Sequence, residues 1–406
     1  EGRYALMQTL IARYKDMTRI PDSGDIPALH GVRALMVLIV AAFHIWQQSW
    51  LTPAVRLFGR VISADTLLRS GYMWVDGLIL LSGFLCYLPY AAAAESGRPL
   101  PNILPFYRKR FWRIMPSFAF NLMVMLLLVA LPQRLYNNPG DMALDVLAHL
   151  SFTFNWFRFS YHMTPLNGAL WTLAVEVQFY LIFPLLARAF SRMPVLTYSL
   201  MAGAAFLFRA WVALWPQADM GFNQLPAFLD VYANGFVAAG IYISLRRRMK
   251  EDGWTRVLMT ACAAAAFLVL AQLASAQAGE ADSQAIRLGQ MMRRYQQSVM
   301  TALCMLGLSL GLGGIRLIFG NPITRFLSGI SFQVYIWHQV LAVQLRQWNI
   351  PYSAVPNPNQ MGDRDWQRKY TWLCRLGALA IATLVTYLIE RPLARLGLGS
   401  ASNTKK

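Results

Sequence analysis

Ten stretches of this 406-residue chain are long and apolar enough to cross a lipid bilayer, and this limits the possible folds more than any other feature. A membrane-spanning helix needs about 20 mostly apolar residues, and in lipid only helices and closed barrels satisfy every backbone polar group. We therefore expect an all-α, polytopic membrane protein with about ten transmembrane helices. The expected spans are residues 33–51, 72–92, 115–132, 167–187, 195–214, 227–245, 255–273, 298–319, 326–345 and 370–389.

Charged residues are few for a soluble protein, and most of them are basic. They make up 14% of the chain, against about 25% in ordinary soluble domains. In a soluble protein the net charge of +18 would suggest nucleic acid, but Lys and Arg also retain loops on the cytoplasmic side of a membrane. We expect membrane lipid around the chain and no nucleic acid partner. The four cysteines lack metal-ligand spacing, so we expect no metal.

The distribution of Lys and Arg predicts the orientation of the chain. With both termini in the cytoplasm, inner segments hold 23 of these 37 residues and outer loops hold 12, as the positive-inside rule predicts. We expect a cytoplasmic interfacial segment at 1–32, which starts with an amphipathic helix over residues 1–20. A transmembrane domain at 33–393 and a cytoplasmic tail at 394–406 follow.

Three outer segments are longer than a turn requires. Residues 133–166 contain an amphipathic run from Asp141 to Trp156, which predicts a short helix at the outer surface. Residues 274–297 and 346–369 are polar, and we expect both to be loops.

The first span carries two polar residues on one helical face, Arg33 and His44. They are eleven residues apart, which is three turns and about 16 Å along the axis. Arg33 is therefore expected at the cytoplasmic mouth and His44 well inside the membrane. A titratable residue at that depth is by default a functional hypothesis. The alternative is an arginine anchor and a histidine that hydrogen-bonds between helices.

Other polar residues lie in or beside the next spans. Asp76, Ser82 and Gly83 belong to the second span. Close helix packing is the alternative explanation for the small residues Ser82 and Gly83. Asp76 is near enough to the surface to be simply hydrated. Arg110 and Arg113 lie on one face at a helix start, where forked guanidinium groups suit phosphate. Topological anchoring is the alternative for this pair.

The fourth and ninth spans also carry polar side chains at membrane depth. Glu176 is in the middle of the fourth span and must be protonated, paired or hydrated there. Ser331, Tyr335 and His338 follow the spacing of one helical face, with His338 near the expected depth of His44.

Three buried charges are expected in the outer halves of other spans. Arg209, Asp230 and Arg375 have no topological reason to lie there, so they are candidates for an outward-facing acceptor pocket, together with Trp171. A structural Arg–Asp pair is an equal alternative.

The ordered set of these motifs resembles the acyltransferase-3 family of integral membrane acyltransferases. The resemblance runs from residue 26 to about 393. It is carried by Arg33 and His44, the 76–84 run, Arg110 and Arg113, the 171–180 run, Ser331 with Tyr335 and His338, and Glu390-Arg391-Pro392.

This resemblance implies acyl-coenzyme A as a cytoplasmic donor and a hydroxyl of a cell-envelope glycan as acceptor, at a bacterial inner membrane. Acetyl is the expected acyl group, with succinyl as the alternative. Many members of the family carry an additional esterase-like domain after the last span. The chain ends at Lys406 without one, so we expect it to complete the transfer alone or to use a separate periplasmic partner protein.

These assignments give an expected mechanism of direct acyl transfer. His44 is the base for the acceptor hydroxyl, oriented by Glu176 or Asp76. Tyr335 or His338 holds the carbonyl oxygen or the acceptor. Phosphate groups of the donor are bound by Arg33, Arg110 and Arg113, with Ser82 and Gly83 beside them.

The main alternative function is a secondary transporter or a flippase of a lipid-linked or anionic substrate. Such a protein would also place His, Glu and Arg in the membrane, but the two halves of this chain show no inverted repeat. A non-catalytic scaffold is a third interpretation, and it leaves Arg33, His44 and Glu176 without a purpose.

Overall fold

The computed structural model describes residues 25–248 and 253–399. The amphipathic helix that we expect over residues 1–20 lies outside these residues. In the described chain, nine helices are long and apolar enough to cross a membrane, and a bent helix pair makes a tenth candidate. The expectation of an all-α, multi-pass membrane protein with about ten spanning helices is therefore confirmed.

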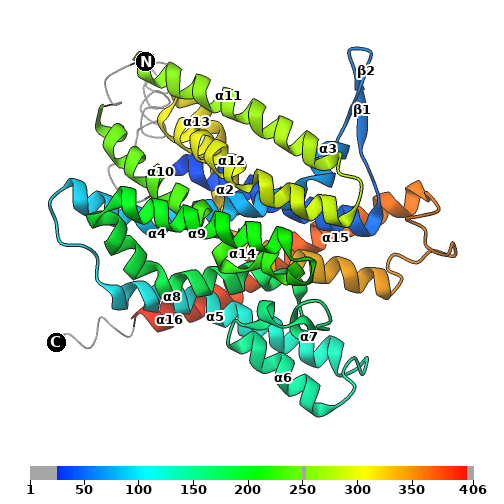
Figure 1. Cartoon of the computed structure of the whole chain (residues 1–406). Coiled ribbons are helices and arrows are strands. Elements are labelled where there is room, and N and C mark those ends of the chain that lie inside the picture. The colour runs from blue at the N-terminus through cyan, green and yellow to red at the C-terminus, as the bar shows by residue number, and fades with distance from the viewer. Residues whose placement is uncertain (1–24, 249–252, 400–406) are drawn as a thin grey trace, which may run out of the picture.

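The long helices run side by side in a single bundle (Figure 1). Their bounds are α2 Pro27–Ser49, α4 Trp74–Glu95, α5 Ile103–Met125, α8 Trp171–Arg192, α9 Pro194–Leu214, α10 Leu229–Arg248, α11 Gly253–Ala278, α12 Ser283–Leu310, α14 Pro322–Gln347 and α15 Arg364–Val385. A π-helical turn at Leu126–Ala130 extends α5, and another at Thr386–Glu390 joins α15 to α16, Arg391–Gly399. The first span begins six residues earlier than expected, with a proline in the first turn, where its missing N–H costs no hydrogen bond.

One expected span was wrong. Residues 298–319 do not form a single helix, and the segment 274–297 before them is not a loop. Instead α12 begins at Ser283, and it is followed by α13, Gly313–Phe319, at an angle of 112°. The chain bends where Gly311, Gly313 and Gly314 weaken the helix. Three polar residues of α12, Gln290, Arg294 and Gln297, are buried against the protein, although a hydropathy pattern suggests a loop there.

A β-hairpin and a pair of short helices extend from one end of the bundle, at opposite edges (Figure 1). A hairpin of β1 Ala54–Leu57 and β2 Arg60–Ser63 was not expected; both residues of its turn have positive φ angles, as two-residue hairpin turns favour. The short helices α6 Pro139–Leu150 and α7 Arg158–Tyr161 extend from the other edge. They fall in the segment where a short amphipathic helix was expected.

Glycines set the closest helix contacts. A β-carbon at Gly235 of α10 would lie 2.6 Å from the carbonyl oxygen of Leu80 in α4. In the same way, a β-carbon at Gly31 of α2 would lie 2.7 Å from Cα of Phe319, at the end of α13. These contacts hold α4 against α10, and α13 against the start of α2, at distances that a larger residue would not allow.

Candidate functional site

A cavity of about 110 Å³ lies among α2, α4, α5, α8, α10 and α14. It brings together residues that are far apart in the sequence and that the spacing of polar residues singles out. These are Arg33, Ser82, Arg110, Arg113, Glu176, Ser331 and Tyr335. The remaining lining is mostly aliphatic, so the polar groups face a largely apolar enclosure.

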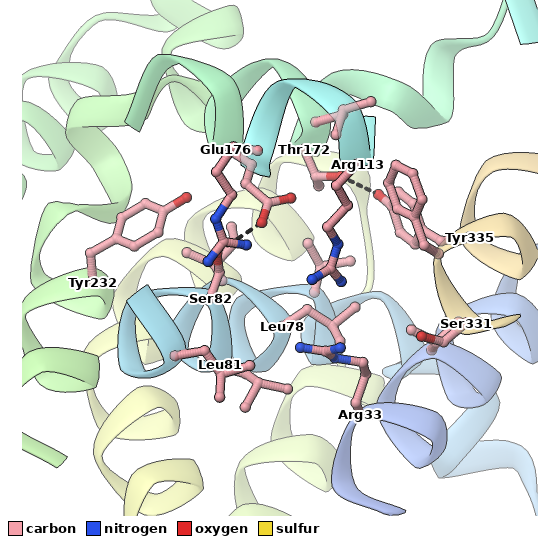
Figure 2. A pocket seen from close by; sticks show the side chains of 17 residues that line it. Arg33, Leu78, Leu81, Ser82, Arg113, Thr172, Glu176, Tyr232, Ser331 and Tyr335 are labelled. Atoms are coloured by element: carbon pink, nitrogen blue, oxygen red, sulfur yellow. Dashed lines mark hydrogen bonds between the residues drawn. The ribbon is translucent and has the colours of Figure 1, made fainter. Parts of the chain in front are cut away.

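The cavity has an excess of positive charge. Arg33 and Arg113 direct their guanidinium groups into the same space from opposite walls, with Glu176 at one flank and Tyr335 at the other (Figure 2). Three arginines and one carboxylate line this space. Guanidinium groups that converge in an apolar enclosure favour a ligand with several anionic oxygens.

Glu176 is held by hydroxyl groups. Ser82 Oγ donates a hydrogen bond of 2.8 Å to Glu176 Oε1, and the hydroxyl of Tyr180 also donates to that oxygen. Arg110 in turn donates to the hydroxyl of Tyr180 at 3.3 Å and lies over its ring at 4.8 Å. Tyr180 therefore connects Glu176 with Arg110. Tyr180 lies about one helical turn from Glu176, and the spacing alone does not indicate this role.

His44 and His338 are hydrogen-bonded to each other. His44 Nδ1 lies 2.8 Å from His338 Nε2, and His338 Nδ1 lies 2.9 Å from the carbonyl oxygen of Val334. A carbonyl can only accept, so Nδ1 of a neutral His338 carries its proton and Nε2 accepts. His44 Nδ1 must then be the donor, which leaves the lone pair on Nε2 of His44. His338 is fully buried and His44 is half-buried, so His44 is the accessible member of the pair.

Tyr335 connects the cavity with the two histidines. Its side chain lines the cavity, and its ring centroid lies 5.7 Å from that of His338, one turn further along α14. The hydroxyl of Tyr335 donates to the carbonyl oxygen of Ala169 at 3.0 Å and shares a hydrogen bond of 2.5 Å with Thr172. Because α2 is continuous, His44 lies about 16 Å along its axis from Arg33.

Glu176 and Asp76 were the residues expected to orient His44, but neither hydrogen-bonds to it in the described chain. Asp76 instead forms an ion pair with Arg294 of α12, at 3.1 Å between Oδ2 and Nε, and both side chains are fully buried. We had not identified Arg294 from the sequence, because the hydropathy pattern places it in a loop.

Arg209 and Asp230 form a buried, two-pronged ion pair. Their nitrogen–oxygen distances are 2.9 and 2.6 Å, so of the two alternatives for these residues the structural pair is the one found. The carbonyl oxygen of Ala227 accepts from Arg209 at 3.0 Å and from Arg294 at 3.2 Å. Asp76 and Asp230 thus belong to one buried network with the two arginines.

The other predicted site residues make separate contacts in the described chain. Arg375 is half-buried, with its guanidinium 5.7 Å from the ring centroid of Trp372. The ring of Trp171 packs near that of Phe228, at 5.9 Å. A β-carbon at Gly83 would lie 3.0 Å from the carbonyl oxygen of Tyr232, so Gly83 is a packing position between α4 and α10. In the described chain, Arg209 and Asp230 pair with each other, while Arg375 and Trp171 contact other aromatic residues.

Comparison with known proteins supports one family. A family model described as an acyltransferase domain, acyltransferase-3, matches residues 26–391. The peptidoglycan O-acetyltransferase OatA of Listeria monocytogenes is 27% identical over 203 residues, which are 47% of this chain and 29% of that protein. The O-acetyltransferase OatA of Staphylococcus aureus is 25% identical over 181 residues, 42% of this chain and 26% of that protein.

The chain thus aligns with less than a third of the length of either relative. No solved structure gives a significant match to it.

Proposed function

Because the chain belongs to the acyltransferase-3 family, we propose that it is a membrane O-acetyltransferase that uses acetyl-coenzyme A from the cytoplasm. The acceptor is a hydroxyl of a cell-envelope glycan on the outer side of a bacterial inner membrane. The names of the relatives describe O-acetylation, in one case of peptidoglycan, and support this class of reaction. The Lys and Arg distribution supports cytoplasmic termini and a cytoplasmic opening for the arginine cavity.

The donor site is the arginine cavity. Coenzyme A carries phosphate groups at one end and the thioester at the other, joined by a long, narrow arm. Arg33, Arg110 and Arg113 bind the phosphates, and the arm leads past Tyr335 toward His44. The thioester has to reach about three helical turns beyond Arg33. Glu176 offsets part of the arginine charge while the donor is absent.

The hydrogen bond between His44 and His338 is the observation that carries the mechanism. It leaves the lone pair of His44 Nε2 available to a reacting hydroxyl. This nitrogen takes the proton as the hydroxyl oxygen attacks the thioester carbon. When the carbon–sulfur bond breaks, the imidazolium returns the proton to the thiolate, so the products are the acetyl ester and free coenzyme A.

His338 acts through His44 in this mechanism, and we assign it a positioning role. It fixes the tautomer and the ring orientation of His44, as the carboxylate does in a Ser-His-Asp triad. Tyr335, at the boundary between the cavity and the histidines, is assigned to the thioester carbonyl oxygen, to which its hydroxyl donates in place of Ala169 when the donor is bound. Glu176 and Asp76 have other partners, so neither is assigned to the orientation of His44.

The test uses purified protein and acetyl-coenzyme A labelled in its acetyl group. We expect free coenzyme A to be released, and label to appear on added cell-wall glycan, with the wild-type protein. His44→Ala should abolish both. His30→Ala is the matched control, because His30 lies on the same helix but hydrogen-bonds to Asp25 at 2.7 Å. A secondary transporter or flippase would leave the thioester intact, and that result would contradict the proposal.

A further inference from the structure

Glu390 has no place in the mechanism above, although it belongs to one of the sequence motifs. It is the last residue of the π-helical turn Thr386–Glu390, where α15 passes into α16. Turns of this kind are rare and are frequently found at functional sites. The carboxylate of Glu390 reaches inward to the fully buried side chain of Gln333 on α14.

Gln333 connects this turn with two long helices. Its Nε2 donates a hydrogen bond of 2.7 Å to Glu390 Oε2 and one of 2.5 Å to Oγ of Ser117 on α5. Its Oε1 accepts from Nε1 of Trp337 at 3.3 Å. An amide has two N–H donors, and both are used here. The carboxylate of Glu390 therefore completes a network that links α5, α14 and the end of α15.

The network holds α5 one turn from Arg113. Arg113 and Ser117 are four residues apart, so they lie on the same face of the helix. Pro116, between them, has no N–H and removes one backbone hydrogen bond from this part of α5. Because the helix is weaker there, the position of this turn depends more on its contacts with neighbouring helices.

The backbone of α5 decides where the Arg113 guanidinium lies. Arg110 is held by the hydroxyl and the ring of Tyr180, whereas Arg113 forms no hydrogen bond or ion pair with the described residues. Its guanidinium points into the cavity opposite Arg33 (Figure 2). Gln333 lies in the sequence between Ser331 and Tyr335, which both line that cavity. The hydrogen bond between Gln333 and Ser117 thus sets the spacing between the two walls.

We propose that Glu390 is a positioning residue of the donor site. By holding the amide of Gln333, it fixes the turn of α5 that carries Arg113 against α14, and so places this arginine for the donor phosphates. The inference rests on the proposed function in one respect, that the arginine cavity binds acetyl-coenzyme A.

A double-mutant cycle on acetyl-coenzyme A binding tests this role. Glu390→Ala removes an acceptor from Gln333 and should raise the Kd about three- to tenfold, the effect of one hydrogen bond. Glu390→Gln keeps an acceptor oxygen and should recover most of the affinity. In an Arg113→Ala background, Glu390→Ala should have little further effect, because the residue that it positions is gone. Losses that multiply in the double variant would indicate general damage to the fold and would overturn the proposal.

The matched control is Glu95→Ala. Glu95 pairs with Arg246 at 3.8 Å near the end of α4, and it does not line the cavity. We expect its Kd to equal that of the wild type, and an equal loss of affinity in Glu95→Ala and Glu390→Ala would also overturn the proposal. Should Glu390→Ala fail to fold, Gln333→Met replaces it, with the same results expected.

A measurement without donor separates this proposal from the proposed function. Phenylglyoxal modifies accessible guanidinium groups, and peptide mass spectrometry reports each arginine of the full chain separately. Loosening of the turn in Glu390→Ala should raise the modification rate of Arg113 about twofold or more relative to that of Arg33. An unchanged ratio would overturn the positioning role whatever the protein binds. A raised ratio in a protein that binds no acetyl-coenzyme A would support the positioning role and contradict only the proposed donor.

Discussion

The imidazole of His44 on α2 donates a 2.8 Å hydrogen bond to the imidazole of His338 on α14. This contact joins two residues that are 294 positions apart in the sequence. Because His338 is itself fixed by the carbonyl oxygen of Val334, the pair has a defined direction of proton donation. The geometry assigns the free lone pair to one atom, Nε2 of His44.

Removal of His338 should slow the reaction without weakening the donor complex. General acid–base catalysis contributes about 10²- to 10⁴-fold, and a misoriented base loses part of that. We expect His338→Ala to lower kcat about tenfold or more and to leave the Kd of acetyl-coenzyme A unchanged. His338→Gln keeps an acceptor for His44 and should recover part of the rate. Equal kcat in wild type and His338→Ala would contradict the positioning role.

The arginines of α5 should determine donor affinity. Hydrogen bonds to charged groups contribute about 1.5–3 kcal/mol, so Arg113→Ala should weaken acetyl-coenzyme A binding about ten- to a hundredfold. Isothermal titration calorimetry measures this directly. Lys109→Ala is the matched control, because Lys109 carries the same charge on the same helix but is exposed and does not line the cavity. The assignment fails if the two variants bind the donor equally well.

Glu176→Gln separates two roles for the carboxylate. The amide oxygen of Gln still accepts from Ser82, but the negative charge beside three arginines is gone. If Glu176 balances arginine charge, donor affinity should rise several-fold, and the rise should shrink at high salt as screening increases. A loss of kcat with unchanged affinity would instead favour a direct role in the reaction.

The Asp76–Arg294 ion pair should be important for stability. Removing one member of a buried pair leaves an uncompensated charge and costs about 3–5 kcal/mol. Asp76→Asn should therefore lower the Tm strongly, whereas the double variant Asp76→Leu/Arg294→Met should recover much of the loss. Asp65→Asn breaks an exposed pair with Arg69 and should have little effect. A double variant less stable than Asp76→Asn would show that the pair has a role beyond charge compensation.

The proposed reaction also predicts sidedness. In oriented proteoliposomes, acetyl-coenzyme A should support acylation only from the side that bears the termini, and the glycan should react only from the other side. Transfer with both substrates confined to one compartment would contradict the proposed arrangement even if the enzyme class is correct.

Much of this architecture can be predicted from the sequence, because lipid imposes long apolar helices and makes each polar exception conspicuous. Arg33, Arg110 and Glu176 were found in this way, and the structure places them in one cavity. Periodicity assigns residues to a face of one helix but does not say which helix packs against it. The partnership of His44 with His338 was therefore not predictable in the same way.

Arg294 shows a different limit. A polar stretch in a membrane protein suggests an exposed loop, but in α12 the side chain of Arg294 is buried and paired with Asp76. Hydropathy measures the residues themselves and not the partners they will meet. The same reasoning explains why Arg209 and Asp230 suggest an acceptor pocket until their ion pair is seen.

The close contact between Gly31 and Phe319 packs the first turns of α2 tightly against the end of α13. Arg33 is two residues from that contact, so the packing of α13 against α2 positions its backbone. The absence of a side chain at Gly31 thus positions the backbone beneath Arg33, whose side chain lines the arginine cavity.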